Sequence, residues 1–283
     1  MSRILFISDL DGTLLSPDSK LSRTTITLLN HAISEGKLVS IATARTPATV
    51  SGLLKDVNLQ IPAIVMTGGA LWDKSTGRYS DVQYFKPRQV RDVVSAYRDA
   101  EGGGFLFTLP PSPDGRDVFE IYHINPLNEV EREFMNERLA SPFKHFLVPE
   151  SGVSEIPDTI ENAVLFFGMQ PKETAAAIYK RLNEIPHINP MLYHDWHGEE
   201  IAEIEAFPES TTKAKAIRRL AERVGADRIV VYGDNVNDLS MMRMADWSVA
   251  VANAVDEVKY AADEVIDSNA ADAVARHILS FSM

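Results

Sequence analysis

Residues 4–13 read ILFISDLDGT, an apolar run that leads into an acidic turn. The four apolar residues 4–7 form a continuous run, which is typical of a strand covered on both faces. The run leads into two carboxylates, Asp9 and Asp11, and then into the turn-forming Gly12. In open α/β sheets, ligands bind beyond the carboxyl ends of the strands. The sequence therefore predicts that functional groups lie at this edge of a sheet.

The same kind of apolar run recurs towards both ends of the chain, separated by helical patterns that stop at Gly36 and Gly225. Alternation of such strands with helices predicts βαβ units and a parallel sheet. The predicted strands are 4–7, 38–42, 63–66, 229–232, 248–251 and 264–266, and the predicted helices are 24–35 and 214–224. We expect an α/β fold with a Rossmann-like, parallel-sheet core.

The middle of the chain has a different pattern. Its strand-like pieces could pair as hairpins, which an all-parallel sheet does not need. The predicted strands here are 105–108, 118–124, 163–168, 191–193 and 201–207, and the predicted helices are 88–100, 129–139 and 173–185. We therefore expect a second α/β domain, a cap, inserted into the first. The predicted division is core at 1–84, cap at 85–206 and core again at 207–283.

Composition narrows the class of protein. The chain has 283 residues, of which 45% are hydrophobic and 24% charged, as in ordinary globular proteins. Its 28 Lys and Arg against 40 Asp and Glu give a net charge of −12 without a basic run, so we expect neither nucleic acid nor a membrane as partner. The absence of cysteine excludes disulfides, thiolate metal sites and cysteine nucleophiles. No apolar run approaches the roughly 18 residues of a membrane helix, so a cytoplasmic protein is expected.

Two acidic loops carry the chemistry. Asp9 and Asp11 repel each other and have no adjacent basic residue, which a hard cation such as Mg²⁺ would explain. An Asp-Gly turn with a coincidental second Asp is the alternative. Residues 232–238, YGDNVND, place Asp234 and Asp238 after another strand, where a polar loop with a helix-capping residue is the alternative. If both loops lie at strand ends of one sheet, they can share one metal.

Two further segments could hold an anionic ligand. Thr43 and Arg45 follow the second predicted strand, where the Thr43 hydroxyl could hold a phosphate oxygen or could cap the next helix. Lys213 falls in the first turn of the helix that follows Ser210–Thr212. A cation there opposes the helix dipole, and an anionic ligand would offset that cost. A solvated surface lysine is the alternative, and Lys215 competes for the same role.

Taken together, the motifs resemble those of the haloacid dehalogenase-like superfamily of aspartate-nucleophile phosphatases, in particular the Cof-type sugar-phosphate phosphatases with a large α/β cap. The resemblance covers the whole chain. Its four motifs match Asp9–Thr13 (D-x-D-G-T), Thr43, Lys213 (in a K-G-x-A-L pattern, with Ala214 replacing Gly) and Gly233, Asp234, Asn237 and Asp238 (G-D-x-x-N-D). Two departures are Thr43-Ala44-Arg45 in place of T-G-R and Gly68-Gly69-Ala70 in place of N-G-A.

The resemblance implies a Mg²⁺-dependent phosphatase that acts on a small phosphorylated metabolite, such as a sugar or polyol phosphate. Asp9 would attack phosphorus and form an aspartyl-phosphate, and Asp11 would be the general acid and base. The implied metal ligands are the Asp9 carboxylate, the Asp11 backbone carbonyl and Asp234. The implied phosphate-binding residues are Thr43, Arg45, Lys213 and Asn237, with Asp238 in a supporting role.

Two other functions stay open at this point. A phosphomutase of the phosphomannomutase type shares this core and cap, and it would isomerise a sugar phosphate instead of releasing phosphate. A non-catalytic sensor of phosphorylated metabolites could use the same fold, although Asp9, Asp11, Lys213 and Asp234 are all present. The expected partner is a small phosphate ester, the expected state a monomer or homodimer. We expect the cap to open and close and to select the substrate.

Overall fold

The computed structural model describes residues 3–111, 119–140, 154–157, 159–194 and 200–281. The chain divides into two compact units, which are described separately. The core unit comprises Met1–Ser80 and Thr212–Met283, and the inserted cap unit comprises Asp81–Thr211. The predicted second joint, between residues 206 and 207, falls inside strand β11 (Ile201–Pro208), because the last residues of that strand still pair with strand β10 (Ile188–His194) of the cap.

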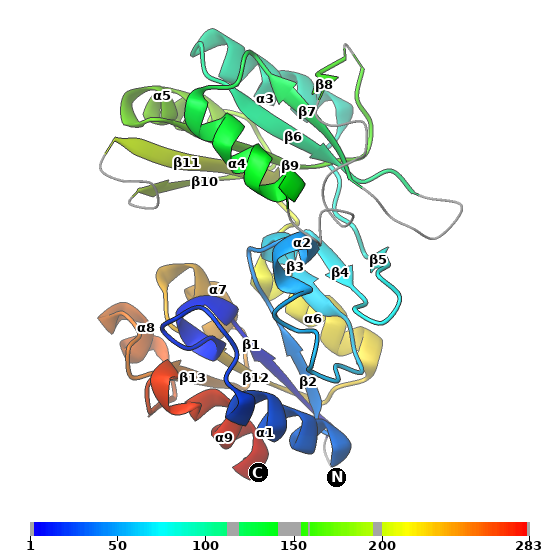
Figure 1. The fold of residues 1–283 in the computed structure, drawn as a ribbon, viewed down its shortest axis with the longest axis vertical. Coiled ribbons are helices and arrows are strands. Elements are labelled where there is room, and N and C mark those ends of the chain that lie inside the picture. The colour runs from blue at the N-terminus through cyan, green and yellow to red at the C-terminus, as the bar shows by residue number, and fades with distance from the viewer. Residues whose placement is uncertain (1–2, 112–118, 141–153, 158, 195–199, 282–283) are drawn as a thin grey trace. The chain divides into compact units, whose positions relative to one another are not determined.

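The core unit is built on a parallel sheet of five strands in the order β14-β13-β12-β1-β2 (Figure 1). The strands are β1 (Ile4–Ser8), β2 (Leu38–Ile41), β12 (Arg228–Gly233), β13 (Trp247–Val251) and β14 (Glu264–Ile266). Every neighbouring pair among them is parallel. Side chains of the central strands, such as Leu5, Ile7 and Val231, are fully buried, as expected for strands covered on both faces. The predicted α/β core is confirmed.

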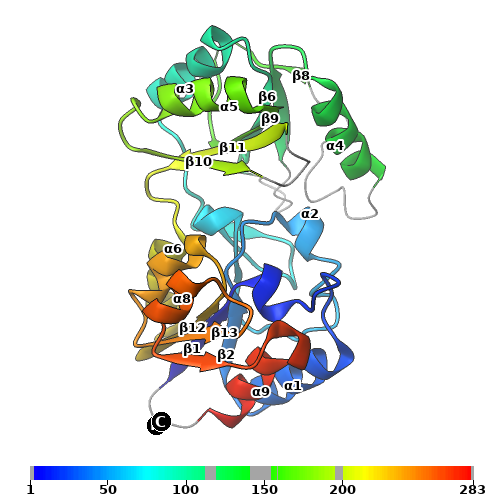
Figure 2. The same ribbon diagram turned by 90° about the vertical axis from the view of Figure 1, so that its left-hand side faces the viewer.

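Helices cover both faces of this sheet (Figure 2). Helices α1 and α9 lie side by side on one face, and α6, α7 and α8 follow one another on the other. The core helices are α1 (Arg23–Ser34), α2 (Pro47–Val50), α6 (Lys213–Val224), α7 (Leu239–Met242), α8 (Asp256–Ala261) and α9 (Ala273–Ser280). Helix α6 begins where the Thr212 hydroxyl accepts a hydrogen bond from the Lys215 amide, and it ends at left-handed Gly225.

The run 63–66, predicted as a further strand of the parallel series, forms the edge of a small antiparallel sheet instead. Strand β3 (Ala63–Val65) pairs with β4 (Ala70–Trp72), which pairs with β5 (Tyr79–Ser80). A single parallel bridge, Ala42 to Ile64, links β3 to the end of β2. The cause is the short 3-10 turn at Met66–Gly68, which reverses the chain after three strand residues.

The cap unit is a mostly antiparallel sheet in the order β10-β11-β9-β6-β7-β8, with helices on both faces. Its remaining strands are β6 (Gly104–Thr108), β7 (Glu120–Ile124), β8 (Ser154–Glu155) and β9 (Ala163–Pro171), and its helices are α3 (Pro87–Asp99), α4 (Glu129–Ala140) and α5 (Lys172–Leu182). The hairpins predicted for this region are present as β6–β7 and β10–β11. Of the predicted strand 118–124, residue 118 lies outside the described residues.

The two faces of the cap sheet are packed differently. Helices α3 and α5 bury an apolar cluster against one face, with Tyr97 and Phe166 among its largest members. On the other face, Phe134 of α4 stacks on Phe167 of β9 and Phe105 of β6, with ring centroids 4.9 and 6.0 Å apart. Across the described part of the chain, no helix is both long and apolar enough to cross a membrane.

The face that carries Phe167 also holds a covered acid. Glu205 of β11 lies between Phe167 and Met191 of the neighbouring strands. Its Oε2 atom is buried and has no hydrogen-bond partner among the described residues. Burial, reinforced by the negative charge of Glu203, raises the pKa of Glu205 to about 8, although the Tyr193 hydroxyl opposes the shift. Glu205 is therefore mostly protonated at neutral pH.

Because the pKa of Glu205 is raised, the stability of the folded protein should depend on pH, and the substitution E205Q should remove this dependence. A carboxyl group whose pKa is higher in the folded state stabilises the fold at low pH, and this contribution is lost as pH rises from about 4.5 to about 8. We expect the free energy of unfolding of the wild type to fall between pH 5 and 8 by at least about 1 kcal/mol more than that of E205Q. Urea titrations in EDTA measure both. Parallel curves for the two proteins would contradict the burial of this charge.

Candidate active site

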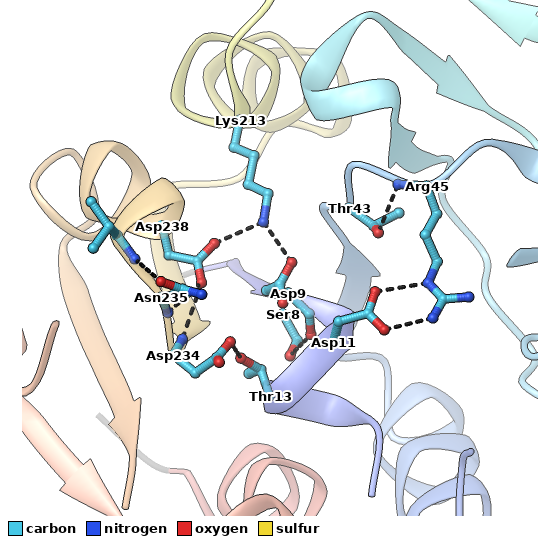
Figure 3. A network of polar contacts seen from close by, with 11 residues as sticks. Ser8, Asp9, Asp11, Thr13, Thr43, Arg45, Lys213, Asp234, Asn235 and Asp238 are labelled. Atoms are coloured by element: carbon cyan, nitrogen blue, oxygen red, sulfur yellow. Dashed lines mark hydrogen bonds and ion pairs between the residues drawn. The ribbon is translucent and has the colours of Figure 1, made fainter. Parts of the chain in front are cut away.

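The two acidic loops meet because β1 and β12 are adjacent parallel strands. Asp9 directly follows β1, and its backbone amide donates to the carbonyl oxygen of Tyr232 in β12, at 3.0 Å. Asp234 directly follows β12, so both carboxylates stand at the same carboxyl edge of the sheet (Figure 3). Asp9 is buried, with a side chain 8% exposed. The predicted meeting point of the two motifs is thus present within the core unit.

Lys213 joins these loops from the start of α6. Its Nζ atom donates to Asp9 Oδ1 at 2.5 Å and to Asp238 Oδ1 at 2.7 Å, and its side chain is only 1% exposed. Burial alone would lower the pKa of Lys213, but the two carboxylates outweigh it, so its pKa is raised and the ammonium stays charged. Lys215, the competing lysine, lies on an exposed part of the helix. The structure therefore brings Lys213, and not Lys215, against Asp9.

Asp234 and Asp238 are held by the turn that follows β12. Asp238 is fully buried, and its Oδ2 atom accepts hydrogen bonds from the backbone amides of Asp234 and Asn235, at 3.0 and 3.2 Å. Asp234 accepts a hydrogen bond from the Thr13 hydroxyl at 2.7 Å. The sequence motif gave Thr13 no predicted role, although its place in the same short loop, four residues after Asp9, is a signal that could have indicated one.

One ammonium, that of Lys213, balances three carboxylates. We call these three residues, Asp9, Asp234 and Asp238, the acidic cluster. Burial raises the pKa of Asp9 to about 7, with Lys213 opposing and the neighbouring aspartates adding to the shift. Burial likewise raises the pKa of Asp234 to about 6, where Thr13 opposes and Asp238 adds. Burial is the main cause of both shifts and the neighbouring aspartates add to it, so a cation bound here would favour the ionised forms of Asp9 and Asp234.

The acidic cluster fits a divalent cation. One carboxylate oxygen from each of its three members lies within 4.8 Å of the others. Carboxylate oxygens are the ligands that Mg²⁺ prefers, and a cation there would supply the missing positive charge. The Asp11 side chain is not a member of the cluster, and the Asp11 backbone carbonyl as a metal ligand stays a prediction.

Arg45, predicted to bind phosphate, contacts Asp11. Its Nε and Nη2 atoms donate to the two carboxylate oxygens of Asp11 at 2.7 and 2.6 Å, a bidentate pair that points the Asp11 side chain away from Lys213 (Figure 3). The pKa of Arg45 is raised, chiefly by this hydrogen-bonded contact with Asp11. Arg45 therefore sets the orientation of Asp11.

The Thr43 hydroxyl lies at the end of β2. Thr43 is buried, and its Oγ1 atom accepts a hydrogen bond from the Arg45 amide at 3.1 Å. The turn after β3 holds this loop in place, because the amides of Met66 and Thr67 donate to the carbonyl oxygens of Arg45 and Thr43. Since Oγ1 is used as an acceptor, the Thr43 hydroxyl can donate its own proton to a ligand.

Gly68, where the resemblance suggests Asn, packs against the start of α6. Its φ is +98°, and a Cβ atom there would lie 2.4 Å from the Thr212 carbonyl oxygen. A side chain at this position would push away the helix end that carries Lys213. Asn237, the remaining predicted phosphate contact, lies exposed on the turn between Asp234 and Asp238.

Comparison with known sequences identifies the family. Residues 6–278 match the haloacid dehalogenase-like hydrolase family, so the chain belongs to it. The chain is therefore a phosphatase of the haloacid dehalogenase type, a phosphoric monoester hydrolase.

The curated relatives that the chain resembles are phosphatases, and a solved structure shares its fold. The chain is 29% identical to 5-amino-6-(5-phospho-D-ribitylamino)uracil phosphatase YwtE of Bacillus subtilis, with 95% of each chain covered. It is 26% identical to pyridoxal phosphate phosphatase YbhA of Escherichia coli, with 96% of each covered. A crystal structure of a haloacid dehalogenase-like hydrolase from Bacteroides thetaiotaomicron superposes with a TM-score of 0.73, at 20% identity and with 98% of each chain covered.

Proposed function

We propose that this chain is a Mg²⁺-dependent phosphatase of small phosphorylated metabolites, with sugar and polyol phosphates as the first candidates, and that it works through a phosphorylated Asp9. The observation that carries the proposal is the buried Asp9 carboxylate, in contact with Lys213 and surrounded by more acidic groups than that lysine balances. The named relatives act on phosphate esters of small molecules, which supports the substrate class.

In the first step, a carboxylate oxygen of Asp9 attacks phosphorus, and the bond from phosphorus to the ester oxygen breaks. Asp11, protonated once its pair with Arg45 has opened, gives its proton to the departing alkoxide. The Lys213 ammonium and the Thr43 hydroxyl bind the phosphoryl oxygens, which lowers the cost of bringing an anionic nucleophile to an anion. The Asp9 and Asp234 carboxylates and the Asp11 carbonyl would hold Mg²⁺, which supplies further positive charge for the transferring group.

In the second step, water opens the aspartyl-phosphate. Asp11, now ionised, takes a proton from the water as it attacks phosphorus, and the bond to Asp9 breaks to release inorganic phosphate. Asp11 must exchange protons twice, so its orientation matters in both steps. We assign Arg45 to holding the ionised form of Asp11, because its bidentate pair keeps that carboxylate apart from the acidic cluster and must open when Asp11 takes up a proton. Asp238 positions Lys213, and Asn237 is a candidate contact for the phosphoryl group.

Metal removal tests the proposal. We expect the purified chain to release inorganic phosphate from at least one ester in a panel of sugar, polyol and cofactor phosphates when Mg²⁺ is present. EDTA should reduce the rate at least about 100-fold, because three clustered carboxylates and an incoming phosphate cannot be balanced by Lys213 alone. Restoring Mg²⁺ should restore the rate. Undiminished release in EDTA would contradict the metal, and an isomerised sugar phosphate without free phosphate would indicate a mutase.

Three further expectations remain proposals with simple tests. The cap is proposed to select the substrate, which cap-loop exchanges test by comparing a generic ester with the best metabolite. A monomer or homodimer is proposed, which light scattering tests. The cytoplasm is the proposed location, which cell fractionation tests.

A further inference from the structure

Asn253 joins two backbone segments beside the acidic cluster. This exposed residue follows β13, and its Nδ2 atom donates to the Gly12 carbonyl oxygen at 2.7 Å. Its Oδ1 atom accepts from the Asn269 amide at 2.9 Å. The Asn269 side chain in turn donates to the Leu15 carbonyl oxygen at 2.8 Å. The two asparagines therefore hold both ends of the turn 12–15 that carries the first motif away from Asp11.

The bond to Gly12 lies where the backbone of the first acidic loop passes against the second. Gly12 has a φ of +79°, and a Cβ atom there would lie 2.3 Å from Asp234 Oδ2, so the backbone passes directly against that carboxylate. The segment that follows Asn253 also holds the second loop, because the Val255 amide donates to the Asp234 carbonyl oxygen at 2.9 Å. One short segment, residues 253–255, is thus bonded to both acidic loops.

We propose that Asn253 is a positioning residue that sets the spacing between the Asp9–Gly12 turn and Asp234, and thereby the affinity of the site for a divalent cation. The proposal rests on the metal requirement of the proposed function. An amide suits the position because it donates to one backbone group and accepts from another. A carboxylate of the same size could not donate to the Gly12 carbonyl and would add charge beside the acidic cluster.

Metal binding and catalysis should respond differently to N253A. Groups that orient metal ligands from outside typically change metal affinity 10–100-fold. We expect calorimetric titration of N253A with Mg²⁺ to give a Kd about 10–100-fold higher than that of the wild type. The Mg²⁺ concentration for half-maximal phosphate release should rise by the same factor. The kcat at saturating Mg²⁺ should stay within about threefold of the wild-type value, because every group that contacts the substrate is kept.

Asn30 provides a matched control within the same unit. Its Nδ2 atom donates to the Asp56 carbonyl oxygen at 2.9 Å, and its Oδ1 atom accepts from the Asn58 amide at 2.8 Å. N30A therefore removes the same two kinds of hydrogen bond without touching either acidic loop. In EDTA, both variants should melt at similar temperatures, which separates a loss of stability from a loss of metal affinity.

Three outcomes of this experiment test the positioning role of Asn253. A raised Kd in N253A with a wild-type Kd in N30A would support the positioning role. A wild-type Kd in both variants, or an equal rise in both, would overturn it while leaving the proposed function intact. A wild-type protein that binds no divalent cation would overturn the metal of the proposed function and this role together, and calorimetry of the wild type alone shows which has happened.

Discussion

Replacement of Asp9 by Asn should abolish phosphate release, with a loss of kcat of about 10⁴-fold or more. The amide is a poor nucleophile towards phosphorus, and it offers a weaker ligand to a metal than the carboxylate does. The shape of the site should survive, because the amide oxygen of Asn can still accept from Lys213 Nζ. Phosphate release from the best ester of the panel, followed at saturating substrate and Mg²⁺, measures the effect.

The stability of D9N separates chemistry from folding. Burial raises the pKa of Asp9 to about 7. Above that pH, the ionised Asp9 carboxylate therefore destabilises the folded, metal-free protein. Removing the charge should therefore leave the melting temperature in EDTA at pH 8 equal to or above that of the wild type. A folded D9N that keeps more than about a tenth of the wild-type rate would show that another group attacks phosphorus.

The sequence alone predicted the positions of those functional residues that come directly after a strand. Asp9 and Asp234 each come immediately after a buried apolar run, and parallel pairing of β1 with β12 then brings them together. Lys213 could be placed in the first turn of its helix from the capping residues before it. These positions depend on local pattern and on one rule of sheet topology, both of which a single chain displays.

Other features depend on contacts that no local pattern displays. The run 63–66 looks like its parallel counterparts, and only the left-handed conformation of Met66 and Thr67 turns it into a hairpin. The pairing of Arg45 with Asp11 joins residues from two different loops and depends on side-chain reach. Asn253 is an exposed asparagine in a loop, and its role emerges only from its contact with Gly12.

The second large effect is expected from K213M, which should lose about 10²–10³-fold in kcat/KM on every phosphate ester alike. The ammonium is the only cation that contacts the acidic cluster among the described residues, and the phosphoryl group needs its charge whatever the leaving group. The same change leaves Asp9 and Asp238 buried and unpaired, which should lower the free energy of unfolding in EDTA by about 3–5 kcal/mol at pH 8. Phosphate release and urea titration measure the two losses.

The double variant K213M/D238N tells these two losses apart. Replacing Asp238 by Asn removes one of the two unpaired charges, and its amide oxygen can still accept from the amides of Asp234 and Asn235. The free energy of unfolding should therefore recover by about half or more of the K213M loss, since the repulsion with Asp9 is gone. Catalysis should not recover, because no positive charge has been returned to the phosphoryl group. Recovery of kcat/KM together with stability would show that Lys213 is only a structural counter-ion of Asp9 and Asp238. Another group would then have to supply the charge that stabilises the transferring phosphoryl group.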